Sequence, residues 1–166
     1  ATSTSAATTT TGAVTTTTAV DETAVRVAAA SELAGPYSGE WTNTTFGSSG
    51  DVDLSLTVDA ATATAEFTLD LGGSVFGGGD PDPVVAQSDL SSDGPYAGTT
   101  DLFDDYTVDI DGGVLTFTAP DISALTGMMM VVTGPIDPTG FELEYTITHP
   151  AGTVFAVGTM TLAPPG

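Results

Sequence analysis

Residues 51–71 read DVDLSLTVDAATATAEFTLDL, and this stretch decides the fold. Apolar and polar residues alternate through its first half, and they alternate again through its second half. A period of two is typical of a β-strand with one buried and one exposed face. A two-residue turn at residues 59 and 60 would place Val52 opposite Phe67, so we expect a hairpin whose apolar residues share one face.

A second hairpin is expected around Gly112 and Gly113, because Gly-Gly suits the primed turns that join antiparallel strands. The residues on either side of this turn alternate between apolar and polar, as in the first hairpin. The turn would pair Ile110 with Leu115 and would again gather the apolar residues on one face.

The last hairpin is expected to join residues 141–148 to the final strand through a loop at residues 150–152. Residues 141–148 alternate Phe, Leu, Tyr and Ile with Glu and Thr, so the apolar set should face the core. A three-residue loop with Gly152 in the left-handed conformation would bury Phe155 and Val157, whereas a two-residue loop would bury their neighbours. We favour the three-residue loop because it buries the larger side chains.

Runs of glycine and proline mark the remaining turns, and short apolar segments lie between them. Residues 84–87 are expected to form an edge strand, and residues 127–133, apolar on both faces, a central strand. Residues 19–34 are ambiguous, because their alanine content favours a helix whereas the alternation at residues 25–27 favours a strand. Turns are expected at residues 77–83, 91–95, 134–135 and 137–140.

The sequence therefore predicts an all-β fold of about eight to ten antiparallel strands joined by tight turns. Such a meander must hide its edges, so we expect an up-and-down barrel or a barrel-like sandwich. At 166 residues the chain suits one domain. We divide it into an extended, Thr-rich N-terminal segment at residues 1–22 and a single β domain at residues 23–166.

The composition is strongly acidic, with 22 Asp and Glu residues against a single Arg and no Lys, for a formal net charge of −21. Such a surface repels nucleic acid and anionic lipid headgroups, so neither is an expected partner. No apolar run reaches the ~18 residues of a spanning helix, so we expect no membrane insertion. The absence of Cys excludes disulfides and thiolate metal sites. Acidic, Lys-poor surfaces resemble those of halophilic proteins, and the richness in Thr, Ser and Gly fits a secreted or cell-surface protein.

Groups that enzymes use are scarce in this chain. His149 is the only side chain that ordinarily titrates near neutral pH, and it precedes Pro150 at a hairpin end, where packing or solvent exposure is expected. The acids mostly take outward strand positions or turns, which is typical of a solvated face rather than of paired catalytic carboxylates. We therefore expect no enzymatic activity.

Clustered aspartates could nevertheless hold calcium, a hard cation that prefers carboxylate and carbonyl oxygens. The acidic clusters do not match the spacing of an EF-hand loop. No other cofactor is expected. The candidate calcium ligands are Asp80, Asp82, Asp101, Asp104, Asp105, Asp109 and Asp111.

The N-terminal tract is rich in threonine and carries neither charge nor proline through residue 18. Threonine favours extended backbone, so the tract could add as a strand to the sheet edge of a neighbouring subunit. Our leading interpretation is a secreted structural subunit that assembles with copies of itself into an extracellular filament or surface matrix. The candidate assembly-strand residues are Thr8, Thr9, Thr10, Thr11, Val14, Thr15, Thr16, Thr17, Thr18 and Val20.

Residues 39–43 read GEWTN and residues 47–48 read GS, and together they resemble the first strand of the calycin barrels. Lipocalins carry Gly-x-Trp there, and avidins carry Gly-x-Trp-x-Asn followed by Gly-Ser. The resemblance covers about ten residues, and here one extra residue separates the Asn from the Gly-Ser pair. It implies a barrel in which Asn43 and Ser48 are polar ligand contacts at the mouth.

This resemblance leads to the alternative interpretation, a monomeric barrel that binds a small apolar ligand. An open pocket beside the single tryptophan would favour this binding barrel, whereas a filled interior would favour the building block. The candidate pocket residues are Tyr37, Trp41, Asn43, Ser48 and Phe67.

Overall fold

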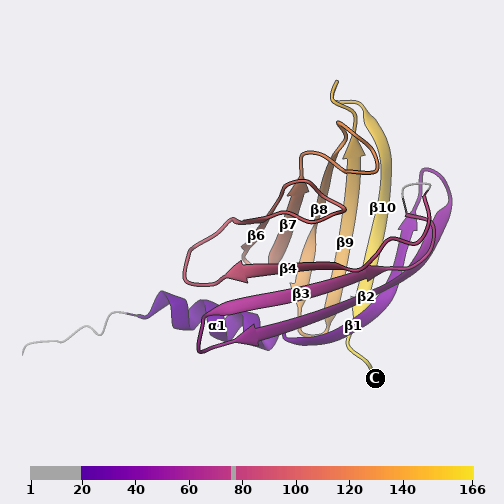
Figure 1. Cartoon of the computed structure of the whole chain (residues 1–166). Helices are drawn as coiled ribbons and strands as arrows, with labels where there is room; N and C mark the ends of the chain where they lie inside the picture. Colours follow the sequence, from indigo (N-terminus) through magenta and orange to yellow (C-terminus); the bar gives the residue numbers. More distant parts are fainter. Residues whose placement is uncertain (1–19, 76–77) are drawn as a thin grey trace, which may run out of the picture.

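The computed structural model describes residues 20–75 and 78–166 of the chain. In this part of the chain one helix precedes ten strands (Figure 1). The elements are α1 Glu22–Glu32, β1 Gly35–Asn43, β2 Ser48–Asp59, β3 Thr64–Leu71, β4 Val84–Asp89, β5 Tyr96–Gly98, β6 Tyr106–Asp111, β7 Val114–Ala119, β8 Met129–Asp137, β9 Gly140–Thr148 and β10 Val154–Ala163.

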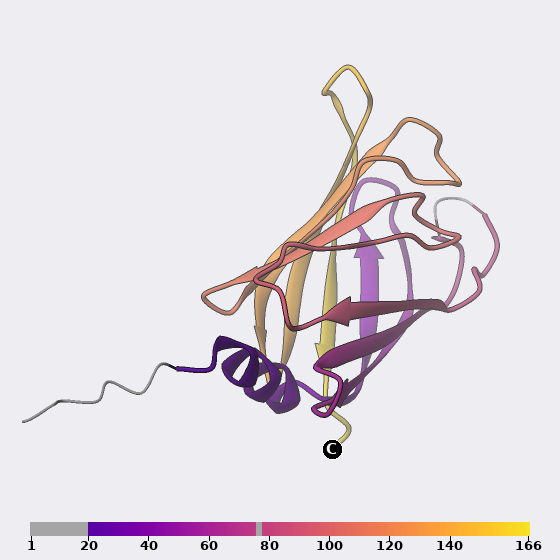
Figure 2. The same ribbon diagram turned by 60° about the vertical axis from the view of Figure 1, so that its left-hand side comes forward.

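The ten strands form one antiparallel sheet that curls into a nearly closed barrel (Figure 2). Consecutive strands are neighbours from β1 to β4 and from β5 to β10, and β1 pairs with β10. The two edges left over belong to β4 and β5, and we call the gap between them the seam. The structure thus confirms the predicted all-β, antiparallel, up-and-down barrel.

Inward side chains of the strands form the hydrophobic core of the barrel. The β9 strand shows the expected alternation, because Phe141, Leu143, Tyr145 and Ile147 are buried while the residues between them are more exposed. Within the described residues, the buried set contains no charged side chain. Removal of this apolar surface from water is the main term that stabilises the fold.

The β2–β3 hairpin differs from the expectation in its register. Asp59 pairs with Thr64, so the connecting loop is longer than two residues. Val52 consequently lies opposite Leu71, and the predicted pairing of Val52 with Phe67 is wrong. The partner moves by an even number of residues, from Phe67 to Leu71, so the apolar rows still share one face.

Hydrogen bonds within the loop explain this longer turn. The Asp59 carboxylate accepts hydrogen bonds from the backbone N–H groups of Ala61 at 2.8 Å and Thr62 at 3.4 Å. These hydrogen bonds hold the pKa of Asp59 below its usual value. The last loop residue, Ala63, takes a left-handed conformation with φ of 52°, which returns the chain to the sheet.

The β6–β7 hairpin follows the prediction. Ile110 pairs with Leu115, and the turn residues Gly112 and Gly113 have φ values of 57° and 79°. Two consecutive positive φ angles are typical of a type I′ turn, whose twist matches that of the flanking strands.

The start of β10 corrects the predicted register of the last hairpin. Gly152 has the expected left-handed φ of 82°, but a β-bulge between Val154 and Ala156 shifts the residues that follow. Ala156 is therefore fully buried while Val157 is 38% exposed, so the expectation that Val157 faces the core is wrong. Phe155, at the bulge, is partly buried against the core.

Most of the ambiguous segment at residues 19–34 is helical, since α1 spans Glu22–Glu32. It begins after Asp21, whose carboxylate accepts a hydrogen bond from the backbone N–H of Ala24 at 3.2 Å and so caps the helix. Within residues 20–75 and 78–166, no helix has the length and apolarity that a membrane crossing requires.

The strand β8 extends further than expected. Residues 134–135, predicted as a turn, lie inside β8, so this prediction is wrong. Gly134 allows β9 to approach closely, since a Cβ atom there would lie 2.1 Å from the Glu142 carbonyl oxygen. As predicted, β8 is a central strand and β4 is an edge strand.

The helix lies against the barrel end where β1 begins (Figures 1 and 2). We call this the helix end, and we call the opposite end the mouth. No residue of α1 is buried, and Arg26 supplies its polar attachment to the loop between β4 and β5. The Arg26 guanidinium donates to the carbonyl oxygens of Leu90 at 2.8 Å and Ser91 at 3.0 Å, and it pairs with the Asp93 carboxylate.

Replacing Ala63 with glycine should stabilise the protein, because the left-handed conformation costs an L-residue about 1–2 kcal/mol but costs glycine little. Glycine also raises the conformational entropy of the unfolded chain, which offsets part of this gain. We therefore expect the free energy of unfolding, measured by chemical denaturation, to rise by about 0.5–1 kcal/mol. The control is Ala60→Gly in the same loop, a position without positive φ, which should lose stability. An unchanged or lower stability of Ala63→Gly would contradict this loop conformation.

Candidate functional site

The two barrel ends differ in the length of their connections. Loops on a rigid scaffold commonly carry function, so the end with the longer loops is where a site is expected. The helix end has the connections 60–63, 90–95, 112–113 and 138–139, and the mouth has 44–47, 72–83, 99–105, 120–128 and 149–153.

A pocket of about 390 Å³ opens at the mouth. This volume lies within the range of roughly 300–1,000 Å³ that is typical of small-molecule sites. Three of the five predicted pocket residues, Trp41, Asn43 and Ser48, line it. The full lining in the described residues is Trp41, Asn43, Phe46, Ser48, Leu71, Ser74, Val75, Leu125, Met130, Tyr145, Ile147, Phe155, Ala156 and Met160.

The other two predicted pocket residues lie elsewhere in the barrel. Tyr37 stacks on Phe141 at 4.6 Å between ring centroids, and its hydroxyl donates to the Leu33 carbonyl oxygen at 2.9 Å. Burial, together with the nearby charge of Asp137, raises the pKa of Tyr37. Phe67 packs edge-on against Tyr106 at 6.4 Å. Neither side chain lines the mouth pocket, so their assignment to one site with Trp41 is not supported.

Trp41 forms part of the pocket wall and is held in one orientation. Its side chain is 6% exposed, and its indole Nε1–H donates to the Gly72 carbonyl oxygen at 2.9 Å. Gly50 makes this contact feasible, because a Cβ atom there would lie 2.7 Å from the indole nitrogen. Trp41 therefore lines the pocket with an aromatic side chain whose single hydrogen-bond donor is already used by the protein.

Asn43 and Tyr145 are two of the polar side chains of the wall. The Asn43 Oδ1 accepts hydrogen bonds from the backbone N–H groups of Thr45 and Phe46, both at 3.0 Å, which shape the β1–β2 loop. Burial raises the pKa of Tyr145, and a hydrogen bond with the Asn43 side chain partly offsets that shift. Because the Asn43 oxygen is occupied, its amide N–H group is the part that can face Tyr145 or a ligand.

Gly158 gives the Tyr145 ring its space. A Cβ atom at Gly158 would lie 2.4 Å from Cζ of Tyr145 and 2.1 Å from the Thr42 carbonyl oxygen. Tyr145 pairs with Gly158 across the β9–β10 ladder. Alternation alone identified Tyr145 as an inward residue, but its place at the mouth depends on the register of β9 against β10.

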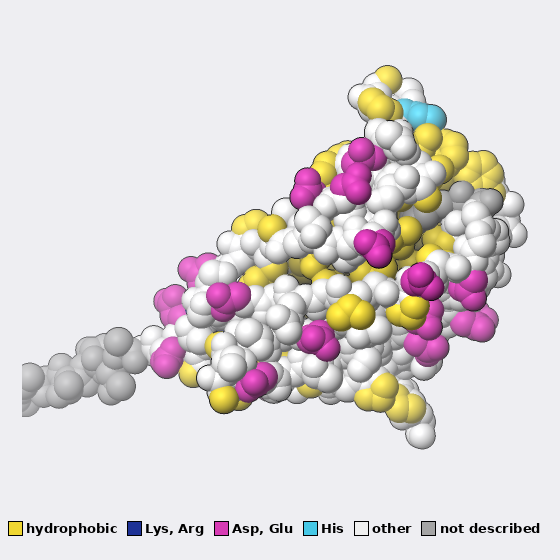
Figure 3. All heavy atoms as spheres, in the orientation of Figure 1, with side chains coloured by type: hydrophobic (Ala, Val, Ile, Leu, Met, Phe, Trp, Pro, Cys, Tyr) yellow, Lys and Arg dark blue, Asp and Glu magenta, His cyan; other side chains and the backbone are white. Residues whose placement is uncertain are grey.

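An aromatic cluster rims the pocket. Phe46 is 61% exposed and packs against Phe155 at 5.4 Å, and His149 contacts the same ring edge-on at 5.2 Å. Figure 3 shows hydrophobic side chains gathered near the histidine, while acidic side chains are spread over much of the rest of that face. Exposed apolar side chains beside a pocket are typical of ligand-binding entrances.

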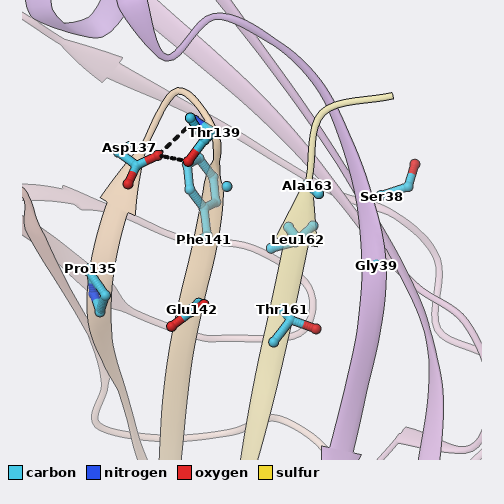
Figure 4. Close-up of a pocket in the computed structure, with 11 residues that line it drawn as sticks. Ser38, Gly39, Pro135, Asp137, Thr139, Phe141, Glu142, Thr161, Leu162 and Ala163 are labelled. Carbon is cyan, nitrogen blue, oxygen red and sulfur yellow. Dashed lines mark hydrogen bonds between the residues drawn. The ribbon is translucent and has the colours of Figure 1, made fainter. Parts of the chain in front are cut away.

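A second hollow of about 490 Å³ lies on the outer face near the helix end (Figure 4). Exposed side chains of neighbouring strands border it, including Glu142 of β9 and its cross-strand partner Thr161 of β10. Hydrogen bonds from the hydroxyl and the backbone N–H of Thr139 hold the pKa of Asp137 below its usual value. This carboxylate is thus used by the β8–β9 turn, and the mouth pocket remains the candidate site.

The candidate calcium ligands do not converge. All seven side chains are exposed, and no group of three His, Asp or Glu residues comes together within the described chain. Asp104 instead accepts a hydrogen bond from the Ser123 hydroxyl at 3.2 Å. The described residues therefore offer the calcium prediction no clustered site.

The assembly-strand prediction falls almost entirely outside the described residues. Residues 8–18 belong to the stretch that the structure does not describe, so this prediction remains open. Val20 is described, is 73% exposed and precedes α1 without joining a strand.

No protein-family model matches the chain, and no curated protein matches it either. We therefore infer function from the residues and geometry of the site itself.

Replacing Gly158 with alanine should destabilise the barrel, because the new methyl group would overlap the Tyr145 ring and the Thr42 carbonyl. We expect the free energy of unfolding to fall by about 1–3 kcal/mol, as for other overpacked cores, in urea denaturation. Gly79→Ala is the matched control, since nothing lies within 4 Å of its Cβ position. Equal stabilities of the two variants would contradict the packing described at the mouth.

Proposed function

We propose that this protein is a binding barrel that takes a small apolar ligand through its mouth. The pocket beside Trp41 carries the proposal, because it is open, has the size of a small-molecule site and is lined mainly by apolar side chains. A ligand that covers this lining would gain roughly 25 cal/mol for each Å² of apolar surface removed from water. The few polar groups, among them Asn43 and Tyr145, would orient it.

Two features of the sequence agree with this proposal. The resemblance of residues 39–48 to the first strand of the calycin barrels implies polar ligand contacts at Asn43 and Ser48, and both residues line the pocket. A binding role also requires none of the catalytic groups that the chain lacks. We place the protein outside the cell, where an acidic, Thr-rich surface would keep it soluble in a cation-rich medium.

Ligand binding can be tested with a neutral hydrophobic dye such as Nile red, whose fluorescence rises in an apolar site. We expect saturable binding that Ser48→Phe weakens at least about tenfold, because the added ring would occupy the pocket. Ser49→Phe is the control, since Ser48 and Ser49 point to opposite faces of β2 and Ser49 is exposed. Absence of binding, or equal binding by the two variants, would overturn the proposal.

A second function, self-assembly by strand addition, is supported by the seam. In the described residues β4 pairs on one side only, with β3, so its other edge has backbone groups that a strand could bind. Figure 3 shows hydrophobic side chains in a furrow across the face that contains β4. We propose that the Thr-rich tract of a neighbouring copy would add there, which would build a filament or surface matrix.

Assembly can be measured by light scattering on the full chain and on a chain that begins at Val20, which keeps the Asp21 helix cap. We expect polymers from the full chain and monomers from the shortened one, because the donor strand is removed. A chain whose residues 1–19 are replaced by a Gly-Ser segment of equal length controls for length and should also be monomeric. If the full chain is monomeric, the assembly proposal fails while the binding proposal stands.

A further inference from the structure

The mouth pocket has an uncharged lining. Among the described residues that form it, none is Asp, Glu, Lys, Arg or His. Its polar groups are all neutral, namely the Tyr145 hydroxyl, the Asn43 amide and the hydroxyls of Ser48 and Ser74. A charged ligand group that entered this lining would lose its hydration without gaining an opposite charge.

The chain cannot easily supply a cation to this site. Arg26 is its only Lys or Arg residue, and it lies at the helix end, at the opposite end of the barrel. There the guanidinium is already bound to two carbonyl oxygens and to the Asp93 carboxylate. The net charge of −21 also lowers the concentration of anions near the surface.

From these observations, and resting on the proposed binding function, we infer that the mouth selects uncharged ligands and rejects carboxylates of the same shape. The ligand class is a compact apolar molecule with one neutral hydrogen-bonding group, such as an alcohol or a ketone. A fatty acid in its ionised form would be excluded, because its carboxylate would be desolvated with neither a cation nor a charged donor to compensate.

The neutral group of the ligand has a defined place in the pocket. The Tyr145 hydroxyl both donates and accepts hydrogen bonds, and the Asn43 amide N–H beside it can donate. The Trp41 N–H is excluded as a partner because it is bound to Gly72. The apolar body of the ligand would then lie against the Trp41 ring and the Met160 side chain.

The single tryptophan allows a direct test, because its fluorescence reports on this pocket alone. Octanol and octanoate, which share the same alkyl chain, are titrated into the full-length protein at pH 8, where the carboxylate of octanoate is ionised. We expect octanol to change the Trp41 emission in a saturable way and octanoate to bind at least about tenfold more weakly. Equal affinities for octanol and octanoate would overturn the inference but leave the binding function intact. If neither compound changes the Trp41 emission and the dye does not bind either, the binding function itself is rejected.

A gain of binding separates the local lining from the overall charge of the protein. Ser48→Lys places an ammonium group at the pocket, and Ser49→Lys changes the net charge by the same amount on the outer face. We expect Ser48→Lys to raise the affinity for octanoate at least about fivefold while octanol still binds, and Ser49→Lys to leave both affinities near those of the original protein. If Ser49→Lys raises octanoate binding as much as Ser48→Lys, the lining does not select the ligand and the inference is wrong.

Discussion

The pairing of β1 with β10 is the constraint on which the rest of the structure depends. Strands β1 to β4 form one meander and β5 to β10 form another, and among the described strands the β1–β10 ladder is the only hydrogen-bonded strand pairing between the two. Its pairs run from Ser38 with Ala163 to Asn43 with Gly158, so it extends along most of β1. Because the ladder joins the first and last strands of the chain, it must form across the longest sequence separation in the fold, where loop-closure entropy is largest.

The binding pocket is built directly on this ladder. Trp41 pairs with Met160, and both side chains face the pocket, while the Asn43–Gly158 pair brings the β1–β2 loop next to Tyr145. Because Gly158 has no side chain, the Tyr145 ring can pack directly over its backbone. The same contacts that close the barrel therefore also shape its mouth, so stability and binding depend on a common set of residues.

Charged side chains lie outside the mouth pocket, at both ends of the barrel. The Arg26 guanidinium binds α1 to the β4–β5 loop at the helix end. At the same end, the Asp59 carboxylate accepts hydrogen bonds in the β2–β3 loop and the Asp137 carboxylate accepts them in the β8–β9 turn. The mouth pocket is neutral and largely apolar. This arrangement avoids a desolvation penalty, because the acidic side chains stay hydrated on the surface and no charge is buried in the pocket.

The sequence by itself determined the all-β class and the inward face of most strands, because side-chain alternation is a local property. It also determined the β6–β7 turn, because a type I′ turn requires two positive φ angles and Gly112 and Gly113 adopt them readily. It also pointed to Trp41, Asn43 and Ser48. Only the tertiary structure decided which inward residues meet at the mouth. Tyr37 and Phe67 face inward as well, yet they lie elsewhere. Tyr37 precedes Trp41 by four residues, about 13 Å, along the same strand, whereas the place of Phe67 depends on the register of β3 against β2. The longer β2–β3 loop and the bulge at Phe155 contribute to these strand registers. Hydrogen bonds to the Asp59 carboxylate hold the loop, the bulge belongs to the β9–β10 pairing, and side-chain alternation encodes neither.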